Sequence, residues 1–445
     1  MAGPFYVDLD SPGSWQGRDG TNSASPWLGI SGMQKALDTV VAGEICYVTG
    51  TGDLSKFYTV TYDASDGTTL TDGEEVTWDA GEGAWADGSD KGIVRVAAST
   101  AGGSGTVEIE LTVGTMPSDN DVIKGTTSGH TITRAATANA RKSLDVDTQT
   151  GTNAAGFIKF IGVDADYTGR TTRAIIDGAS AATEHGFYVI NAKDMYWWEN
   201  IEVKRIAGTT KHGWCANGYG PGGHFWMNCC VNNCSGDGWG ISSGYFKESA
   251  WVRCVAYSNT GSGFNSSQAN NLVLFCTARQ NTGSGFGQQQ YQIGCVAWYN
   301  TVNGFNLTAA QLAMNCVADN NQGCGFNHSG STANKPMILI ANRVTSQNQA
   351  GTDAGMTLAN EPCILGWNYF EDNGDDPADD IINDTFAYLL YEEGTTTDSN
   401  KYSQADTNEG YVSHPALHTA PDLSTNYVAA DDPTLRRTAI TLPWS

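Results

Sequence analysis

Charged residues are scarce in this sequence, and basic residues are the scarcer kind. Charged side chains make up 16% of the 445 residues, and 24 Lys and Arg stand against 48 Asp and Glu, for a net charge of −24. A protein that binds a nucleic acid duplex uses Lys and Arg to displace counterions, so we expect no nucleic-acid partner. An anionic membrane surface is disfavoured for the same reason.

Proline and long apolar runs are also rare. The chain has 12 Pro, and its longest apolar runs, such as residues 336–341, are far too short to span a bilayer. The first residues lack a basic segment followed by an apolar one, so we expect no signal peptide, synthesis in a cytosol and no membrane partner. The 11 Cys are an odd number, so disulfides cannot pair them all, and a cytosol keeps thiols reduced. We therefore expect reduced cysteines.

Aromatic and small uncharged residues are abundant instead. The sequence has 13 Trp and 18 Tyr, and 40% of its residues are hydrophobic, which is enough for a core and excludes global disorder. The 53 Gly, with many Asn, Ser and Thr, fill much of the rest. This profile favours an all-β chain with many turns over a helical one.

One repeat dominates the middle of the chain. A glycine followed by an aromatic residue recurs at intervals of 19 to 27 residues. A cysteine precedes five of these glycines by nine residues, and an asparagine follows four of the cysteines by five residues. A third column, mostly asparagine, comes directly after the aromatic residue in the last four repeats. The columns are Gly186-Phe187, Gly213-Trp214, Gly238-Trp239, Gly263-Phe264, Gly285-Phe286, Gly304-Phe305 and Gly325-Phe326; Cys229, Cys254, Cys276, Cys295 and Cys316; Asn259, Asn281, Asn300 and Asn321; and Asn265, Gly287, Asn306 and Asn327.

Columns that stay in register over variable spacing indicate stacked coils. Each repeat holds short β runs between turns, such as residues 251–257 and 272–278, and coils of about 20 residues would stack at roughly 4.8 Å. We expect the aromatic residues and a reduced cysteine ladder in the interior, and asparagines at left-handed turns that hydrogen-bond to their neighbours. The sequence therefore predicts a right-handed parallel β-helix, with the hand taken from the rule for parallel crossovers.

The segments around the repeat predict a cap, an insert and a tail. A predicted helix with one apolar face, Ser31 as its N-cap and Gly43 at its end is followed by a strand at 45–48. The alternating run at 106–113 indicates a small β domain. We therefore divide the chain into an N-terminal cap with the first coil (1–58), an inserted small β domain (59–140), the parallel β-helix (141–370), and an acidic C-terminal segment and tail (371–445).

Two resemblances follow from these residues. The helix-then-strand start, coils such as Ile201-Glu-Val203 and the Cys, Asn and Phe columns resemble the pectate-lyase-like β-helix superfamily, over residues 26–50 and 160–370. This resemblance implies a fold and no particular activity. Three short segments at 15–20, 119–129 and 436–440 are similar to segments of tailed-bacteriophage structural proteins, which implies a virion protein made in the host cytoplasm.

Cleavage of a polysaccharide on such a fold needs clustered groups on one exposed sheet. A hydrolase needs two paired carboxylates, and a lyase needs a Ca²⁺ carboxylate cluster near a base. Within 184–330 no two acids hold equivalent positions in neighbouring repeats, and Arg205, Arg253 and Arg279 lack acidic neighbours in the repeat. We interpret these charges as solvated turns and predict no catalytic residue. The acids are Glu184, Asp194, Glu199, Glu202, Asp237, Glu248 and Asp319.

Several short motif matches have a structural explanation. Residues 218–223 fit GxGxxG and residues 240–244 fit GxSxG, but neither has the strand–turn–helix context that its chemistry needs. The Gly-His-Phe at 223–225 departs from the Gly-His-Gly of polygalacturonases at its third residue. The Asn-x-Ser/Thr sequons indicate N-glycosylation only in a secreted protein. They begin at Asn265, Asn306, Asn327 and Asn383.

Three groups of residues have both a binding interpretation and a structural one. The cysteines at 229, 230 and 234 lack a second pair, so we expect core packing and no metal site. The acidic run in 372–380 lacks EF-hand spacing, so we expect a solvated loop, with Ca²⁺ binding as the alternative. Five Trp offer a sugar-stacking face or packing in the core or between subunits, and we favour packing. The two larger sets are Asp372, Asp375, Asp376, Asp379 and Asp380, and Trp197, Trp198, Trp226, Trp251 and Trp298.

Together these observations predict a non-catalytic virion structural protein of a tailed bacteriophage, as a capsid decoration, fibre or spike. No cofactor is expected. The expected partners are other virion proteins, further copies of the chain as in a homotrimer, and a host surface glycan. The alternative is a tailspike-like depolymerase that degrades or binds polysaccharide on the same β-helix. A bacterial surface adhesin is a third class, disfavoured by the missing secretion signal.

Overall fold

The computed structural model describes fifteen stretches of the chain, which form two compact units, Met1–Ser249 and Ala250–Ser445. None of the described helices is long and apolar enough to span a membrane. Most of the predicted segment 371–445, with its acidic run, Asn383 and the 436–440 motif, lies outside the described residues. The described residues are 4–81, 88–96, 100–181, 184–190, 193–218, 222–266, 270–287, 291–307, 311–328, 337–345, 347, 355–357, 363–371, 381–382 and 387–393.

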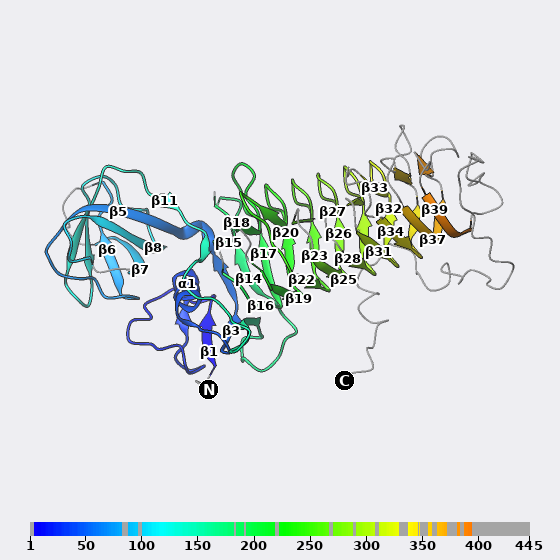
Figure 1. Ribbon diagram of the computed structural model, residues 1–445. Helices are drawn as coiled ribbons and strands as arrows, with labels where there is room; N and C mark the ends of the chain where they lie inside the picture. The colour runs from blue at the N-terminus through cyan, green and yellow to red at the C-terminus, as the bar shows by residue number, and fades with distance from the viewer. Residues whose placement is uncertain are drawn as a thin grey trace. The chain divides into compact units, whose positions relative to one another are not determined.

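In the first unit, parallel strands pair with the equivalent strand one coil further along the chain (Figure 1). One ladder contains β1 (Phe5–Asp8), β3 (Ile45–Thr49), β13 (Ile158–Gly162), β16 (Tyr196–Glu199) and β19 (Phe225–Met227), with β2 (Trp27–Leu28) on β1. A second contains β4 (Thr51–Asp53), β14 (Ala174–Asp177), β17 (Ile201–Lys204) and β20 (Cys230–Asn232). A third contains β12 (Leu144–Val146), β15 (Phe187–Ile190), β18 (Trp214–Asn217) and β21 (Trp239–Ile241).

The second unit has the same three parallel ladders. The first contains β22 (Ala250–Val252), β25 (Leu272–Leu274), β28 (Tyr291–Ile293), β31 (Leu312–Met314), β34 (Met337–Ile340), β37 (Cys363–Glu371) and β39 (Ala387–Glu393). The second contains β23 (Val255–Tyr257), β26 (Thr277–Arg279), β29 (Val296–Trp298), β32 (Val317–Asp319) and β35 (Arg343–Thr345), which pairs with β37. The third contains β24 (Phe264–Asn265), β27 (Phe286–Gly287), β30 (Phe305–Leu307), β33 (Phe326–His328), β36 (Met356–Thr357) and β38 (Ile381–Ile382). Three parallel strands per coil confirm the predicted parallel β-helix.

The aromatic column of the second unit stacks as predicted. The rings at 264, 286, 305 and 326 are fully buried, and successive centroids lie 4.9, 4.9 and 4.6 Å apart with nearly parallel planes. The glycine before each ring is needed because coils approach closely there. A Cβ at Gly285 would lie 2.7 Å from the Gly304 carbonyl oxygen. In the first unit Trp214 and Trp239 stack in the same way, with centroids 5.4 Å apart.

The cysteine column also lies in the interior. All ten cysteines whose side chains are described are buried and form no disulfide. Their thiols donate weak hydrogen bonds to carbonyl oxygens, as from Cys276 Sγ to Leu274 O at 3.4 Å. These residues therefore pack as small hydrophobic side chains, and the neighbours Cys229, Cys230 and Cys234 belong to the same core.

The asparagine column forms a buried hydrogen-bonded ladder, but the predicted left-handed turn is misplaced by one residue. Asn281 donates to Asn300 Oδ1 from its backbone N at 3.1 Å and from Nδ2 at 3.0 Å, and the same pair of bonds joins Asn300 to Asn321. The left-handed residue is the one before each asparagine, such as Gln280 and Tyr299. That residue makes the bend between strands, and the bend turns the asparagine side chain inward.

An antiparallel sheet lies in the region where the sequence predicts an inserted β domain. It has its own core around Val60, Trp78 and Ile109, and the run at 106–113 lies in β8, which pairs with β5 and β7. A 3-10 turn, η1 (Leu54–Lys56), precedes the sheet. Its strands are β5 (Phe57–Ser65), β6 (Glu75–Trp78), β7 (Asp90–Arg95), β8 (Gly105–Val113), β9 (Val122–Gly125), β10 (Thr131–Arg134) and β11 (Ala140–Arg141).

The predicted helix is present as α1 (Gly29–Thr39), but both of its predicted ends are wrong. The N-cap residue is Leu28, which makes no side-chain cap. Instead Glu110 from β8 accepts hydrogen bonds from the backbone N of Ile30 at 3.0 Å and of Ser31 at 2.9 Å, so Ser31 is capped and does not cap. The helix ends four residues before Gly43 because Val40 is already extended.

Candidate functional site

The five tryptophans proposed as a sugar-stacking face fall into two groups. Trp198, Trp226 and Trp251 are fully buried in the core, as the packing interpretation predicts. Trp197 and Trp298 are half-buried and lie at outward positions of their strands. Only these two are able to contact a ligand.

Trp197 belongs to an outward row of one parallel ladder. Side chains alternate along a strand, so Tyr196 and Trp198 point inward while Trp197 points outward. The register places Lys159 beside Trp197 on one strand and Phe225 beside it on the other. The Trp197 and Phe225 ring centroids lie 4.3 Å apart, and Lys159 Nζ lies 5.5 Å from the Trp197 ring centroid. The row presents an aromatic pair with a cation at its side.

A buried carboxylate and a half-exposed arginine border this row. Glu199 accepts a hydrogen bond from Trp197 Nε1 at 3.1 Å and pairs with Arg170. The Glu199 side chain is 7% exposed, whereas Arg170 is 50% exposed. The carboxylate therefore lies beneath the guanidinium, and the outer N–H groups of the guanidinium face solvent. We call Lys159, Arg170, Trp197, Glu199 and Phe225 the Trp197 strip.

Most of the other acids considered from the sequence contact protein partners. The solvated-turn interpretation is wrong for Glu199 and Asp237, which are buried: Glu199 pairs with Arg170, and Asp237 lies against the His212 imidazole. Glu248 is an exposed turn residue with a left-handed backbone. The remaining contacts are Glu184 with Lys211 Nζ (2.8 Å), Asp194 with Gly222 N (2.7 Å), Glu202 with Asn232 Nδ2 (3.0 Å) and Arg173 (3.8 Å), Asp237 with His212 Nδ1 (3.5 Å), and Asp319 with Thr345 Oγ1 (2.6 Å).

Arg205 has an acidic partner that the sequence did not reveal. Its Nε donates to Asp177 Oδ1 at 2.8 Å, and Lys204 Nζ lies 3.6 Å from Asp177 Oδ2. Burial raises the pKa of Asp177, but hydrogen bonds from Arg205 and from the Ala179 backbone, with the charge of Lys204, outweigh it and lower the pKa. Asp177 precedes the repeat at 184–330, so the repeat pattern gives no sign of this ion pair. Arg279 lies over the Tyr257 ring, at 5.1 Å from its centroid.

A group of potential metal ligands, His185, His212 and Cys215, also escaped the sequence analysis. One ligand atom from each lies within 4.8 Å of the others, and all three residues are buried. The two imidazoles stack with centroids 5.2 Å apart. Each histidine directly precedes a Gly-aromatic pair, and the two lie 27 residues apart. Their equivalent positions in neighbouring repeats therefore indicate that the two side chains stack.

The hydrogen bonds of this group favour a structural stack over a metal centre. His185 Nδ1 accepts from the His212 backbone N at 3.0 Å, and His212 Nδ1 accepts from the Asp237 backbone N at 2.8 Å. A neutral ring whose Nδ1 accepts carries its proton on Nε2, which leaves no free lone pair for a metal. Burial lowers the pKa of His185 to about 3 and raises the pKa of Cys215 to about 12, so both remain neutral.

The rejected motifs have structural roles where they are described. Ser242 follows β21, and its backbone N donates to Ala216 O at 2.9 Å, in a bend with no helix after it. His224 is buried, and its Nε2 contacts Lys193 O at 2.8 Å. The centre of the GxGxxG match, 219–221, lies outside the described residues.

Comparisons with known proteins bear on the fold. No family model matches the chain, and no curated protein matches its sequence. Pectate lyase Pel9A matches 93% of this chain and 84% of its own, with 14% identity and a TM-score of 0.50. The chain has a pectate-lyase-like β-helix fold. A rhamnogalacturonan lyase (14% identity, TM-score 0.44, 84% of this chain and 74% of that one) and the A-module of the Azotobacter vinelandii mannuronan C-5 epimerase AlgE4 (12%, 0.39, 54% and 80%) are more distant matches.

Proposed function

We propose that this chain is a glycan-binding β-helix protein that holds an acidic polysaccharide along the Trp197 strip and does not cleave it. The observation that carries the proposal is the half-buried Trp197–Phe225 pair, with Lys159 over the Trp197 ring and Arg170 on the neighbouring Glu199. Pectate lyase Pel9A, which has a similar fold, is by its name an enzyme that acts on a polysaccharide, and this agrees with a glycan as the ligand class.

Two features of the strip suit an acidic sugar chain. The apolar face of a sugar ring packs on an aromatic ring, and Trp and Tyr are the side chains that combine such a surface with a polar edge. A sugar carboxylate beside it would accept charge-assisted hydrogen bonds from the outer N–H groups of Arg170. Glu199 is covered by that guanidinium, so the strip presents its cations outward although the chain as a whole is acidic.

The use of the carboxylates supports the proposal that the chain binds a glycan without cleaving it. Of the seven acids considered from the sequence, five accept a hydrogen bond or pair with a cation within the described residues, and Asp237 is buried against the His212 imidazole. General acid–base catalysis needs two groups free to exchange protons with the substrate at a defined separation. The buried Glu199, bound to Arg170 and to the Trp197 indole, is a positioning group for the strip.

Replacement of Trp197 by alanine should weaken binding of polygalacturonate by about tenfold or more, because stacking area is lost. The matched control is Trp298→Ala, since Trp298 is also half-buried and outward on its strand. The measurement is isothermal titration of the full chain with polygalacturonate, alongside a thermal unfolding curve for each variant. Equal affinity for the parent and a folded Trp197→Ala variant would contradict the proposed site.

We keep the non-catalytic virion role as a second proposal, because three short segments are similar to bacteriophage structural proteins. No comparison links the chain to a bacteriophage. Trp15, in one of those segments, is buried and donates from Nε1 to Ser31 Oγ at 3.1 Å, so packing alone accounts for it. Labelled antibody on purified particles would decide this role, and unlabelled particles would refute it.

A further inference from the structure

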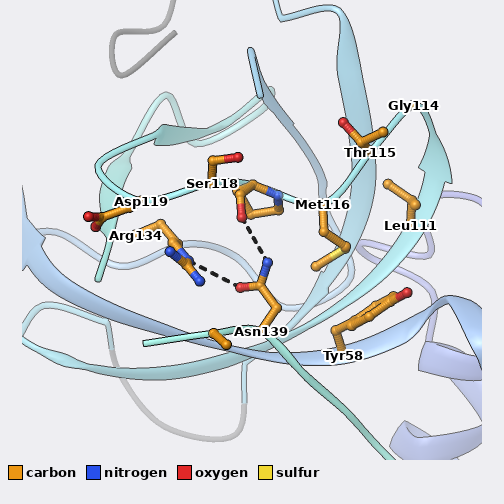
Figure 2. Close-up of a pocket in the computed structure, with 11 residues that line it drawn as sticks. Tyr58, Leu111, Gly114, Thr115, Met116, Ser118, Asp119, Arg134 and Asn139 are labelled. Atoms are coloured by element: carbon orange, nitrogen blue, oxygen red, sulfur yellow. Dashed lines mark hydrogen bonds between the residues drawn. The ribbon is translucent and has the colours of Figure 1, made fainter. Parts of the chain in front are cut away.

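The antiparallel sheet carries a pocket that is separate from the Trp197 strip. It is shallow and largely open to solvent, with a volume of about 610 Å³, within the range of small-ligand sites. Figure 2 shows side chains from β5, β8, β10 and the loop after β8 arranged around it. Its lining includes Tyr58, Leu111, Met116, Ser118, Arg134 and Asn139.

Arg134 is the unusual member of this lining. Its residue surface is only 6% exposed. The guanidinium donates from Nε to Asn139 Oδ1 at 3.3 Å and from Nη2 to Thr137 O, and these bonds leave Nη1 without a protein partner among the described residues. Several other described arginines, such as Arg95 and Arg173, pair with a carboxylate, whereas no described carboxylate lies within ion-pair distance of Arg134.

Arg134 has no carboxylate counter-charge among the described residues, and an anion bound in the pocket would supply one through a charge-assisted hydrogen bond. Asp121, two residues beyond the lining loop, is not available, since it accepts hydrogen bonds from the backbone N of Gly81 and of Ser118. Asp119 lines the pocket but is exposed at its rim. The inner part of the pocket is therefore cationic.

The rest of the lining fits a small ring that carries hydroxyl groups. Tyr58, Leu111 and Met116 provide an aromatic and apolar wall, and Ser118 supplies a hydroxyl (Figure 2). The loop is held in place, because Asn139 Nδ2 donates to Pro117 O at 2.7 Å and Ser118 N donates to Asp121 Oδ2 at 2.6 Å. The site is thus preformed, which lowers the entropic cost of binding.

We propose that this pocket binds a single carboxylate-bearing sugar, a uronic acid, with its carboxylate on Nη1 of Arg134 and its ring against Tyr58. The inference does not rest on the proposed polysaccharide site, since the two involve different strands and different residues. An acidic monosaccharide satisfies the buried guanidinium, the aromatic wall and the polar rim together, whereas a neutral sugar leaves the guanidinium unpaired.

The test is a titration of the full chain with D-galacturonate and, separately, with its uncharged methyl ester, followed by ligand-observed NMR. We expect the acid to bind about tenfold more tightly than the ester, and Arg134→Gln to weaken binding of the acid by about tenfold, because one charge-assisted hydrogen bond is lost. Lys91→Gln, which removes a cation elsewhere on the same sheet, should change affinity less than twofold.

Each outcome decides the proposal. Equal binding of acid and ester to the parent protein would overturn it, and so would no binding of the acid or unchanged affinity in a folded Arg134→Gln variant. If Arg134→Gln does not fold, the comparison of acid and ester on the parent protein still tests the proposal. Tyr58→Leu then tests whether the aromatic lining contributes to galacturonate affinity. Trp298→Ala, which lies in neither proposed site, should leave galacturonate affinity unchanged. The strip is tested separately with polygalacturonate, so failure of the strip and failure of the pocket are distinguishable.

Discussion

Phe286→Ala should lower the free energy of unfolding by about 3–5 kcal/mol. Phe286 is fully buried, and its ring lies between those of Phe264 and Phe305 at 4.9 Å on each side. Truncation removes the contacts on both faces and leaves a cavity that stacked strands cannot close, because their spacing is fixed by the ladder hydrogen bonds. Guanidinium denaturation followed by far-ultraviolet circular dichroism measures the change.

The control for this experiment is Phe275→Ala, in the same unit of the chain. Phe275 is 37% exposed and lies at a left-handed bend, so its truncation should cost well under half as much. If the two variants lose similar stability, the aromatic column is not the main source of coil packing. A loss below about 1 kcal/mol for Phe286→Ala would contradict the stacked core directly.

Acidification should destabilise the first unit through its buried histidines. Burial lowers the pKa of His185 to about 3 and of His224 to about 4, and it lowers the pKa of His212. The unfolded chain takes up these protons near pH 6.5, so between pH 6.5 and the folded pKa it binds more protons than the folded chain. Stability is complete above pH 6.5 and falls by about 1.4 kcal/mol per pH unit per histidine below it.

The measurement compares the parent with His185→Gln at pH 8 and at pH 5. The difference at pH 8 reports the lost stacking, because the histidine is neutral in both states there. Between pH 6.5 and 5 the parent should lose about 2 kcal/mol more than the variant. Identical pH dependence in the two proteins would show that His185 takes up a proton equally readily in the folded and unfolded states.

The coil architecture was accessible from the sequence because a β-helix stacks like residues on like. The phenylalanine column gave the register of β24, β27, β30 and β33 directly. The asparagine ladder was predicted too, but its left-handed residue was assigned one position late, since hydrogen-bonding capacity and backbone strain fall on adjacent residues. A column in the sequence shows which residues stack and not which one bends.

Features that depend on contacts between distant segments were missed. Ser31 looks like an N-cap locally, yet Glu110, 79 residues later, supplies the cap because β8 places its carboxylate at the helix start. The Asp177–Arg205 pair arises from the register of β14 with β17, outside the window of the repeat. The Arg134 pocket depends on antiparallel pairing in the insert, where no column fixes the register.

The sequence alone predicts the Trp197 strip only in part. All five tryptophans were candidates, but the choice between core and surface depends on the parity of each position within its strand. Trp197 and Trp198 are adjacent and so face opposite sides, which the pattern Tyr196-Trp-Trp-Glu199 leaves open. In the structure the neighbouring strand alternates in the same way, with Phe225 half-buried and Trp226 fully buried. Trp197 therefore faces outward and Trp198 faces the core.

The central claim, binding of an acidic polysaccharide without cleavage, has one direct measurement. The full chain is incubated with polygalacturonate, with and without Ca²⁺, and the same samples are assayed for bound polymer, for new reducing ends and for unsaturated uronates. We predict bound polymer and no new ends under either condition. Turnover that disappears in Asp237→Asn or Asp319→Asn would contradict the claim and show that the protein is a depolymerase.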